Sequence, residues 1–116
     1  LGGARLAVRH LHDLGHRRIA TIVGLAHTKP AADRLLGYRA ELQELGLTPK
    51  PGYEAAGDFY MESGEAAMKQ LLALPEPPTA VFAASDMMAV GAIRTIEEAG
   101  LRCPEDIAVV DPDGNT

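Results

Sequence analysis

The chain has 116 residues, of which 47% are hydrophobic and 23% are charged, with one cysteine. This balance is that of an ordinary soluble domain, and it excludes a disordered chain, a collagen-like repeat and a coiled coil. Eleven Lys and Arg residues against sixteen Asp and Glu residues give a net charge of -5, which opposes binding to the phosphates of a nucleic acid. No apolar run reaches the length of a membrane span and no export signal is visible, so we expect a soluble, cytoplasmic protein.

Helices and strands are predicted to alternate along the chain. Segments with a helical spacing of apolar residues, each ended by glycine or proline, predict four helices, at residues 3–14, 31–45, 64–74 and 86–99. Short apolar runs predict four strands, at residues 19–23, 53–58, 79–84 and 107–110. In the first helix, Ala7, Leu11 and Leu14 form the stripe that we expect to face the core.

Regular alternation with short connections is typical of a parallel sheet covered by helices on both faces. We therefore predict an α/β fold, an open doubly wound unit of three layers (α/β/α), with a mostly parallel sheet of about four strands. The chain opens on a helix and closes soon after a strand, which leaves neither edge of the sheet finished. We expect it to be a piece of a larger protein.

The carboxyl ends of the predicted strands gather polar and aromatic side chains. Ligands of open parallel sheets bind at this edge, near the point where the strand order reverses. One guanidinium, several carboxylates, a hydroxyl and two aromatic rings leave it, in Arg34, Asp58, Phe59, Tyr60, Ser85, Asp86, Asp111 and Asp113. Such a set suits a hydroxyl-rich or heterocyclic small molecule. Taken singly, these residues are explained as well by helix caps, solvated side chains and core, and their joint placement favours binding.

Other kinds of chemistry find little support. His12 and His16 have the spacing of a zinc-protease helix, but Asp13 replaces the required Glu and the helix ends between them, so no metal is expected. No glycine-rich phosphate-binding motif follows a strand, and no cofactor is expected. Asp58 and Asp113 are an imaginable acid/base pair, but carboxylates that bind ligand hydroxyls explain them equally well. We therefore favour a protein that is not an enzyme.

Five segments carry a family resemblance. They are LHDLGHRRIA at 11–20, RLLGY at 34–38, GDF with ESG at 57–64, PTAVFAASD at 78–86 and GLRCPEDIAVV at 100–110. In this order and spacing they resemble the lactose-repressor/galactose-repressor (LacI/GalR) family of bacterial transcription regulators. The resemblance implies that residues 1–116 are the carboxyl-terminal subdomain of the effector-binding core, one half of a fold similar to periplasmic sugar-binding proteins. The DNA-binding headpiece and the amino-terminal subdomain would be absent.

The resemblance also implies a set of ligand-binding residues. Arg34, in the RxxG[FY] motif, would contact the effector, Phe59 would stack on it, and Asp113 would accept its hydrogen bonds. Ser85 stands where family members often have Asn, and it is assigned to the same site. The chain departs from the family at residues 110–114, where VDPDG replaces the usual Val-Gly-[FY]-Asp-[DN] and alters the floor of the cleft.

Members of this family usually dimerise through this subdomain. Met87, Val90 and Arg94 lie on the side of the last helix that faces away from the predicted core, so they are our candidates for a homodimer interface. We expect an effector-sensing domain whose partners are a sugar or nucleoside-like molecule and, through the missing headpiece, operator DNA. The alternative is a solute-binding protein of a sugar transporter with the same fold, and an enzyme ranks third.

Overall fold

The computed structural model describes residues 2–25, 27–48 and 50–113, and within these ranges the chain forms four helices and four strands. The helices are α1 (Gly2–Asp13), α2 (Lys29–Glu44), α3 (Met61–Leu72) and α4 (Asp86–Glu98). The strands are β1 (Ile19–Val23), β2 (Glu54–Ala56), β3 (Ala80–Ala83) and β4 (Ala108–Val110). None of the helices in these ranges is long and apolar enough to span a membrane.

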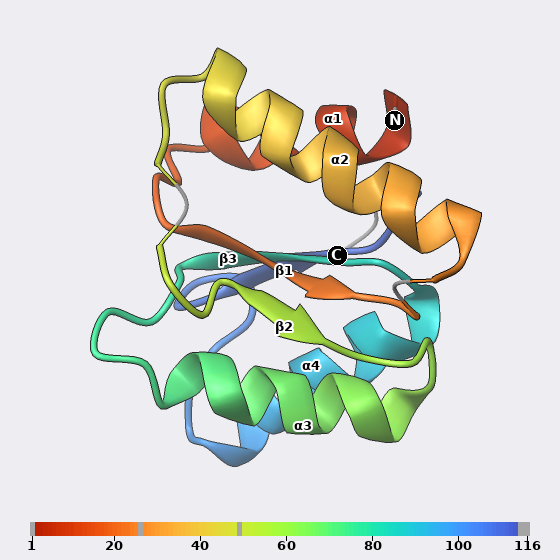
Figure 1. Cartoon of the computed structure of the whole chain (residues 1–116). Coiled ribbons are helices and arrows are strands. Elements are labelled where there is room, and N and C mark those ends of the chain that lie inside the picture. The colour runs from red at the N-terminus through yellow and green to blue at the C-terminus, as the bar shows by residue number, and fades with distance from the viewer. Residues whose placement is uncertain (1, 26, 49, 114–116) are drawn as a thin grey trace.

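The strands form one parallel sheet in the order β2-β1-β3-β4. Helices α1 and α2 cover one face of this sheet, and α3 and α4 cover the other (Figure 1). The predicted doubly wound α/β/α architecture is therefore confirmed. The chain runs outward from β1 to β2 and then returns to β3 on the other side of β1. The strand order thus reverses between β1 and β3, which is where ligands of such sheets bind.

The element boundaries differ from the predicted ones for local reasons. Helix α2 begins at Lys29 because the side chain of Thr28 caps it, accepting a hydrogen bond from the Ala31 amide. Strand β2 is three residues long instead of the predicted six. Just beyond it, the amide of Asp58 donates to the Ser63 hydroxyl, which turns the chain out of the sheet and into α3.

The core has two parts, one on each face of the sheet. On the α1 and α2 face, Ala7 and Leu11 are buried as predicted, together with Val8. The prediction for Leu14 is wrong, because this side chain is 60% exposed. The helix ends at Asp13 and Gly15 turns the chain with a left-handed φ of 103°, so Leu14 no longer follows the helical stripe.

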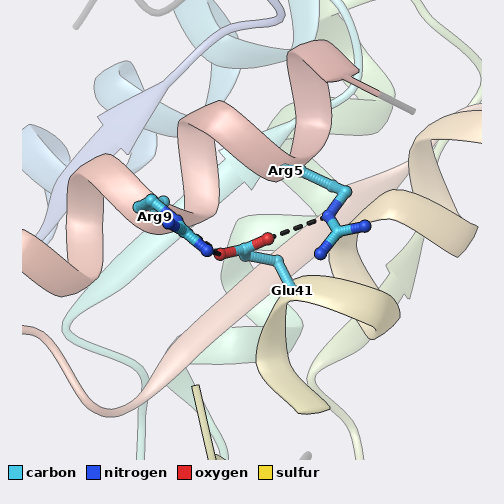
Figure 2. Close-up of polar contacts among 3 residues, drawn as sticks. All are labelled: Arg5, Arg9 and Glu41. Atoms are coloured by element: carbon cyan, nitrogen blue, oxygen red, sulfur yellow. Dashed lines mark hydrogen bonds and ion pairs between the residues drawn. The ribbon is translucent and has the colours of Figure 1, made fainter. Parts of the chain in front are cut away.

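One buried carboxylate joins α1 and α2, the two helices that cover the same face of the sheet. Glu41 in α2 is only 1% exposed, because it lies inside the contact between α2 and α1. Its Oε1 accepts a hydrogen bond from Arg5 Nε at 2.9 Å and its Oε2 accepts one from Arg9 Nε at 2.7 Å (Figure 2). Burial works against the charged form, but the hydrogen bonds from the two arginines prevail and the pKa of Glu41 is lowered. The ion pairs therefore hold α1 against α2.

We expect Glu41→Gln to lower the free energy of unfolding at pH 7 by about 1–2 kcal/mol, because two charge-assisted bonds weaken while both arginines remain half-exposed to water. Since the folded pKa lies below the unfolded one, the stabilisation is present above about pH 4.3 and is lost as the pH falls through the folded pKa. Urea unfolding followed by circular dichroism at pH 7 and at acid pH measures both effects.

The control for this variant is Glu98→Gln, which neutralises an exposed glutamate of α4. We expect this control to change stability by less than about 0.5 kcal/mol, as is usual for a surface substitution. A Glu41→Gln variant that is as stable as the parent chain at pH 7 would contradict the assigned role.

Candidate functional site

The predicted ligand-binding residues converge at the carboxyl ends of β1 and β3. Arg34 comes from α2, Ser85 is the N-cap residue of α4, and Phe59 lies in the loop between β2 and α3. Arg34 Nη1 donates to the carbonyl of Ala84, and the Ser85 hydroxyl donates to the carbonyl of Phe59. The carboxylate of Asp113 lies within 4.8 Å of that of Asp86, the neighbour of Ser85. The sequence prediction that these residues share one edge is confirmed, while their roles toward a ligand stay a prediction.

Arg34 links the helix that follows β1 to the segment that follows β3. Its helix, α2, covers one face of the sheet, and its bond of 2.8 Å reaches Ala84, which follows β3 directly. The side chain is only partly buried. A guanidinium carries five N–H donors in a planar fork, and the bond to Ala84 uses one of them. The group is therefore held in place by the sheet while it retains the geometry to bind oxygen atoms of a ligand.

Phe59 has an unusual backbone. Its φ is +78°, in the left-handed region that phenylalanine seldom adopts. The ring lies directly over Gly24, the first residue after β1: a Cβ atom placed on Gly24 would be 2.0 Å from Cε1 of the ring. The side chain is half-buried against the core on the α3 and α4 side. An aromatic face is thus seated at the end of β1, in the position that suits stacking on a sugar or a heterocycle.

Asp58 is bound within its own loop. Its Oδ1 accepts a hydrogen bond of 3.0 Å from the amide of Tyr60, and its own amide donates to Ser63 Oγ. The hydrogen bond from the Tyr60 amide, and after it the nearby Ser63 hydroxyl, lower the pKa of the Asp58 carboxyl. A carboxylate with a lowered pKa is a poor proton acceptor, which does not favour the acid/base pair of Asp58 with Asp113.

Three carboxylates meet beside Arg34. Single oxygen atoms of Asp86, Asp111 and Asp113 lie within 4.8 Å of one another, and the Asp113 amide donates to Asp111 Oδ1 at 3.0 Å. Burial, followed by the charges of the other two aspartates, raises the pKa of Asp86, while Arg34 opposes the rise. These are the described residues that are close enough to share a cation, but two of the three are exposed and the trio suits ligand hydroxyls as well.

A groove of about 470 Å³ opens on the Arg34 side of the edge. Its walls are the first turns of α1 and α2 and the segment after β4, and it is lined by Gly3, Ala4, Lys29, Pro30, Asp33, Arg34, Pro112 and Asp113. Two residues of the family departure at 110–114, Pro112 and Asp113, therefore lie in the wall of this groove, and residue 114 is outside the described residues. The sequence marks Gly24 only as the end of a strand, and its contact with the Phe59 ring is visible only in three dimensions.

Comparison with known proteins places this geometry in a family. Residues 8–115 match the family model described as a periplasmic binding protein-like domain. The chain belongs to this family. It is 47% identical over 111 residues to the ribose operon repressor of Escherichia coli K12, covering 96% of this chain and 34% of the repressor. It is 44% identical over 116 residues to the regulator CelR of Thermobifida fusca, covering 100% of this chain and 34% of CelR.

Solved structures agree. The structure of the CelR–cellobiose complex superposes with a TM-score of 0.91 at 44% identity, over 95% of this chain and 34% of that one. A LacI-family sugar-binding regulator from Escherichia coli, solved with phosphate, gives a TM-score of 0.89 at 30% identity, over 93% of this chain and 39% of that one. The resemblance to LacI/GalR regulators is confirmed, and these relatives are named as transcriptional regulators, not as enzymes or transporters. The chain spans about a third of the length of the curated relatives.

The two perturbed aspartates give a direct test of the site's electrostatics. We expect the Asp58 carboxyl to titrate below the usual value of 3.8 and the Asp86 carboxyl to titrate above it. Replacement of Arg34 by Ala should raise the pKa of Asp86 further, because the guanidinium opposes the rise, whereas Asp111→Asn should lower it. Carboxyl ¹³C resonances followed through an acid titration give each value. Asp86 titrating below Asp58 would contradict this arrangement.

Proposed function

We propose that this chain is the effector-sensing half of a LacI/GalR-type regulator. Residues 1–116 form the carboxyl-terminal subdomain of the effector-binding core, and the ligand is a sugar or nucleoside-like molecule. The observation that carries this proposal is the meeting of Arg34, Phe59 and Asp113 at the edge where the strand order reverses. In this reading the guanidinium and the carboxylate bind hydroxyl groups and the ring stacks on the apolar face of the ligand. Ser85 belongs to the same site.

The relatives support a sugar-like ligand. CelR is described in complex with cellobiose, and another relative is the ribose operon repressor. Both carry a chain like this one in about a third of their length, so the second wall of the cleft and the DNA-binding headpiece belong to residues outside this sequence. Operator DNA is the partner of that headpiece, which agrees with the net charge of -5 of this domain. The protein acts in the cytoplasm, and we assign it no catalytic step and no cofactor.

The mechanism is a shift between conformations. A ligand that touches both walls of a cleft binds the closed state more tightly than the open one, and it therefore increases the population of the closed state. Closure then changes operator affinity, a coupling between two distant sites. In this chain Arg34 is already fixed by the bond to Ala84, so little side-chain entropy is lost when a ligand binds.

The charges at the edge select the ligand. Carboxylates outnumber cations there: the carboxylates are those of Asp33, Asp58, Asp86, Asp111 and Asp113, and the cations are Arg34 and Lys29. Lys29 is paired with Asp33 at 3.1 Å. A phosphorylated or carboxylated ligand would meet an excess of negative charge among these residues, whereas hydroxyl groups would find acceptors. An uncharged polyhydroxylated ligand fits this edge.

We expect uncharged pentoses, hexoses or nucleosides to bind the full-length regulator at least about tenfold more tightly than their phosphate esters, since a single close like-charge contact costs on the order of 1 kcal/mol or more. Isothermal titration with matched pairs, such as ribose and ribose 5-phosphate, measures the ratio. Preference for the phosphate ester would overturn the assigned ligand class while leaving the location of the site untouched.

The second test concerns Arg34. In the full-length regulator, Arg34→Ala should weaken effector binding by about 10- to 100-fold, because a charge-assisted bidentate contact contributes roughly 1.5–3 kcal/mol. Operator affinity without effector should stay unchanged. Fluorescence anisotropy with labelled operator DNA, with and without effector, reads out both quantities.

The matched control is Arg39→Ala. Arg39 lies on the same helix, but its guanidinium is bound to Glu54 through bonds of 2.8 and 2.7 Å. We expect this control to respond to effector as the parent protein does. A normal response from Arg34→Ala would refute the proposed site.

The exposed side of α4 supports a homodimer. Met87 is 50% exposed, Val90 is 44% exposed and Arg94 is exposed beside them, while the opposite side of the helix is buried. We assign this surface to self-association. Val90→Asp should shift the full-length protein toward monomer in sedimentation velocity runs, because a desolvated charge opposes the interface. A parent protein that stays monomeric well above cellular concentration would refute the dimer.

A further inference from the structure

The aromatic ring at the end of β1 depends on a backbone that does not hold this conformation by itself. Phe59 has a φ of +78°, which costs a non-glycine residue free energy and requires support from its surroundings. Its carbonyl accepts a hydrogen bond from Ser85 Oγ at 2.9 Å. This bond ties the loop between β2 and α3 to the N-cap residue of α4, the second residue after the end of β3, across 26 positions of sequence. This hydrogen bond therefore restrains the backbone of Phe59, whose conformation determines where the ring lies.

The Ser85 hydroxyl has almost no capacity left for a ligand. A hydroxyl has one proton to donate and two lone pairs to accept with. The proton is used on the Phe59 carbonyl, and one lone pair accepts a hydrogen bond of 3.2 Å from the Met88 amide at the start of α4. Ser85 therefore cannot donate to a ligand without releasing Phe59. Its two bonds anchor the loop to a helix terminus that is itself packed on the sheet.

The backbone of Gly24 lies against the ring of Phe59. The space that a Cβ atom on Gly24 would fill is occupied by the ring, with Cε1, Cζ and Cδ1 at 2.0, 2.2 and 2.7 Å from that position. The ring consequently rests on bare backbone at the carboxyl end of β1. Any side chain at position 24 would force the ring of Phe59 to move, since non-bonded carbon atoms do not approach one another so closely.

We propose that Ser85 is a positioning residue: it acts on the ligand through Phe59, by locking the backbone that holds the ring against Gly24, and it makes no donor contact of its own. This inference rests on the proposed function in one respect, that the ring of Phe59 is the stacking surface for the ligand. The positioning itself is a property of the unliganded chain and is measurable there.

The two phenylalanines of the chain allow a direct measurement. Incorporation of 4-fluorophenylalanine gives one ¹⁹F resonance from Phe59 and one from Phe82, which is fully buried in β3 and reports on the fold. Ser85→Ala should shift and broaden the Phe59 resonance while that of Phe82 stays in place. Ser85→Thr keeps the hydroxyl and should restore the parent signal. Gly24→Ala should displace the Phe59 resonance with Ser85 intact. A Phe59 resonance that is unchanged in Ser85→Ala overturns the proposal.

A double-mutant cycle with D-ribose in the full-length regulator separates positioning from direct contact. We expect Ser85→Ala to weaken ribose binding in the parent protein and to have no further effect when Phe59 is already Ala. Equal losses in both backgrounds would mean that Ser85 contacts the ligand directly, which overturns the proposal. A parent protein that binds no ribose counts against the proposed ligand, and the ¹⁹F result in the unliganded chain then decides the positioning.

Discussion

The strand order β2-β1-β3-β4 is the constraint on which the site depends. Because β1 and β3 are neighbours but their following helices go to opposite faces, the chain diverges at the carboxyl ends of these two strands. Ligands of open parallel sheets bind at such a point. Arg34, on the helix after β1, reaches Ala84 after β3, and Ser85 reaches the loop that follows β2. These two bonds draw three separate connections into one surface.

The site is held from both layers of the molecule. On one side, the buried carboxylate of Glu41 joins α1 to α2, the helix that carries Arg34 (Figure 2). On the other side, Ser85 joins the Phe59 loop to α4. In both layers, polar contacts within the chain hold an element that carries part of the proposed site. Preorganisation of this kind raises affinity chiefly by reducing the entropy lost on binding.

Much of this organisation was predictable from the sequence, because hydrophobic spacing and glycine or proline stops fix the order of the elements. The parallel sheet and its carboxyl edge follow from that order, and with them the meeting of Arg34, Phe59 and Asp113. The predicted burial of Leu14 is wrong because the spacing of apolar residues does not locate the end of a helix to within one residue. Glu41 looks like any other glutamate on a surface helix, since its burial arises from two arginines more than 30 residues away. The seat of Phe59 on Gly24 is equally invisible, because it joins residues from two different connections.

In our proposal, a small uncharged ligand binds at the carboxyl edge of the sheet, between β1 and β3. An amide ¹H–¹⁵N titration of the chain with ribose, cellobiose and uncharged nucleosides tests it most directly. We expect the shifted resonances to cluster around Gly24, Phe59 and Ser85, near the carboxyl ends of β1 and β3. Shifts that gather at the opposite edge, where His16 is bound to Thr79, would contradict it.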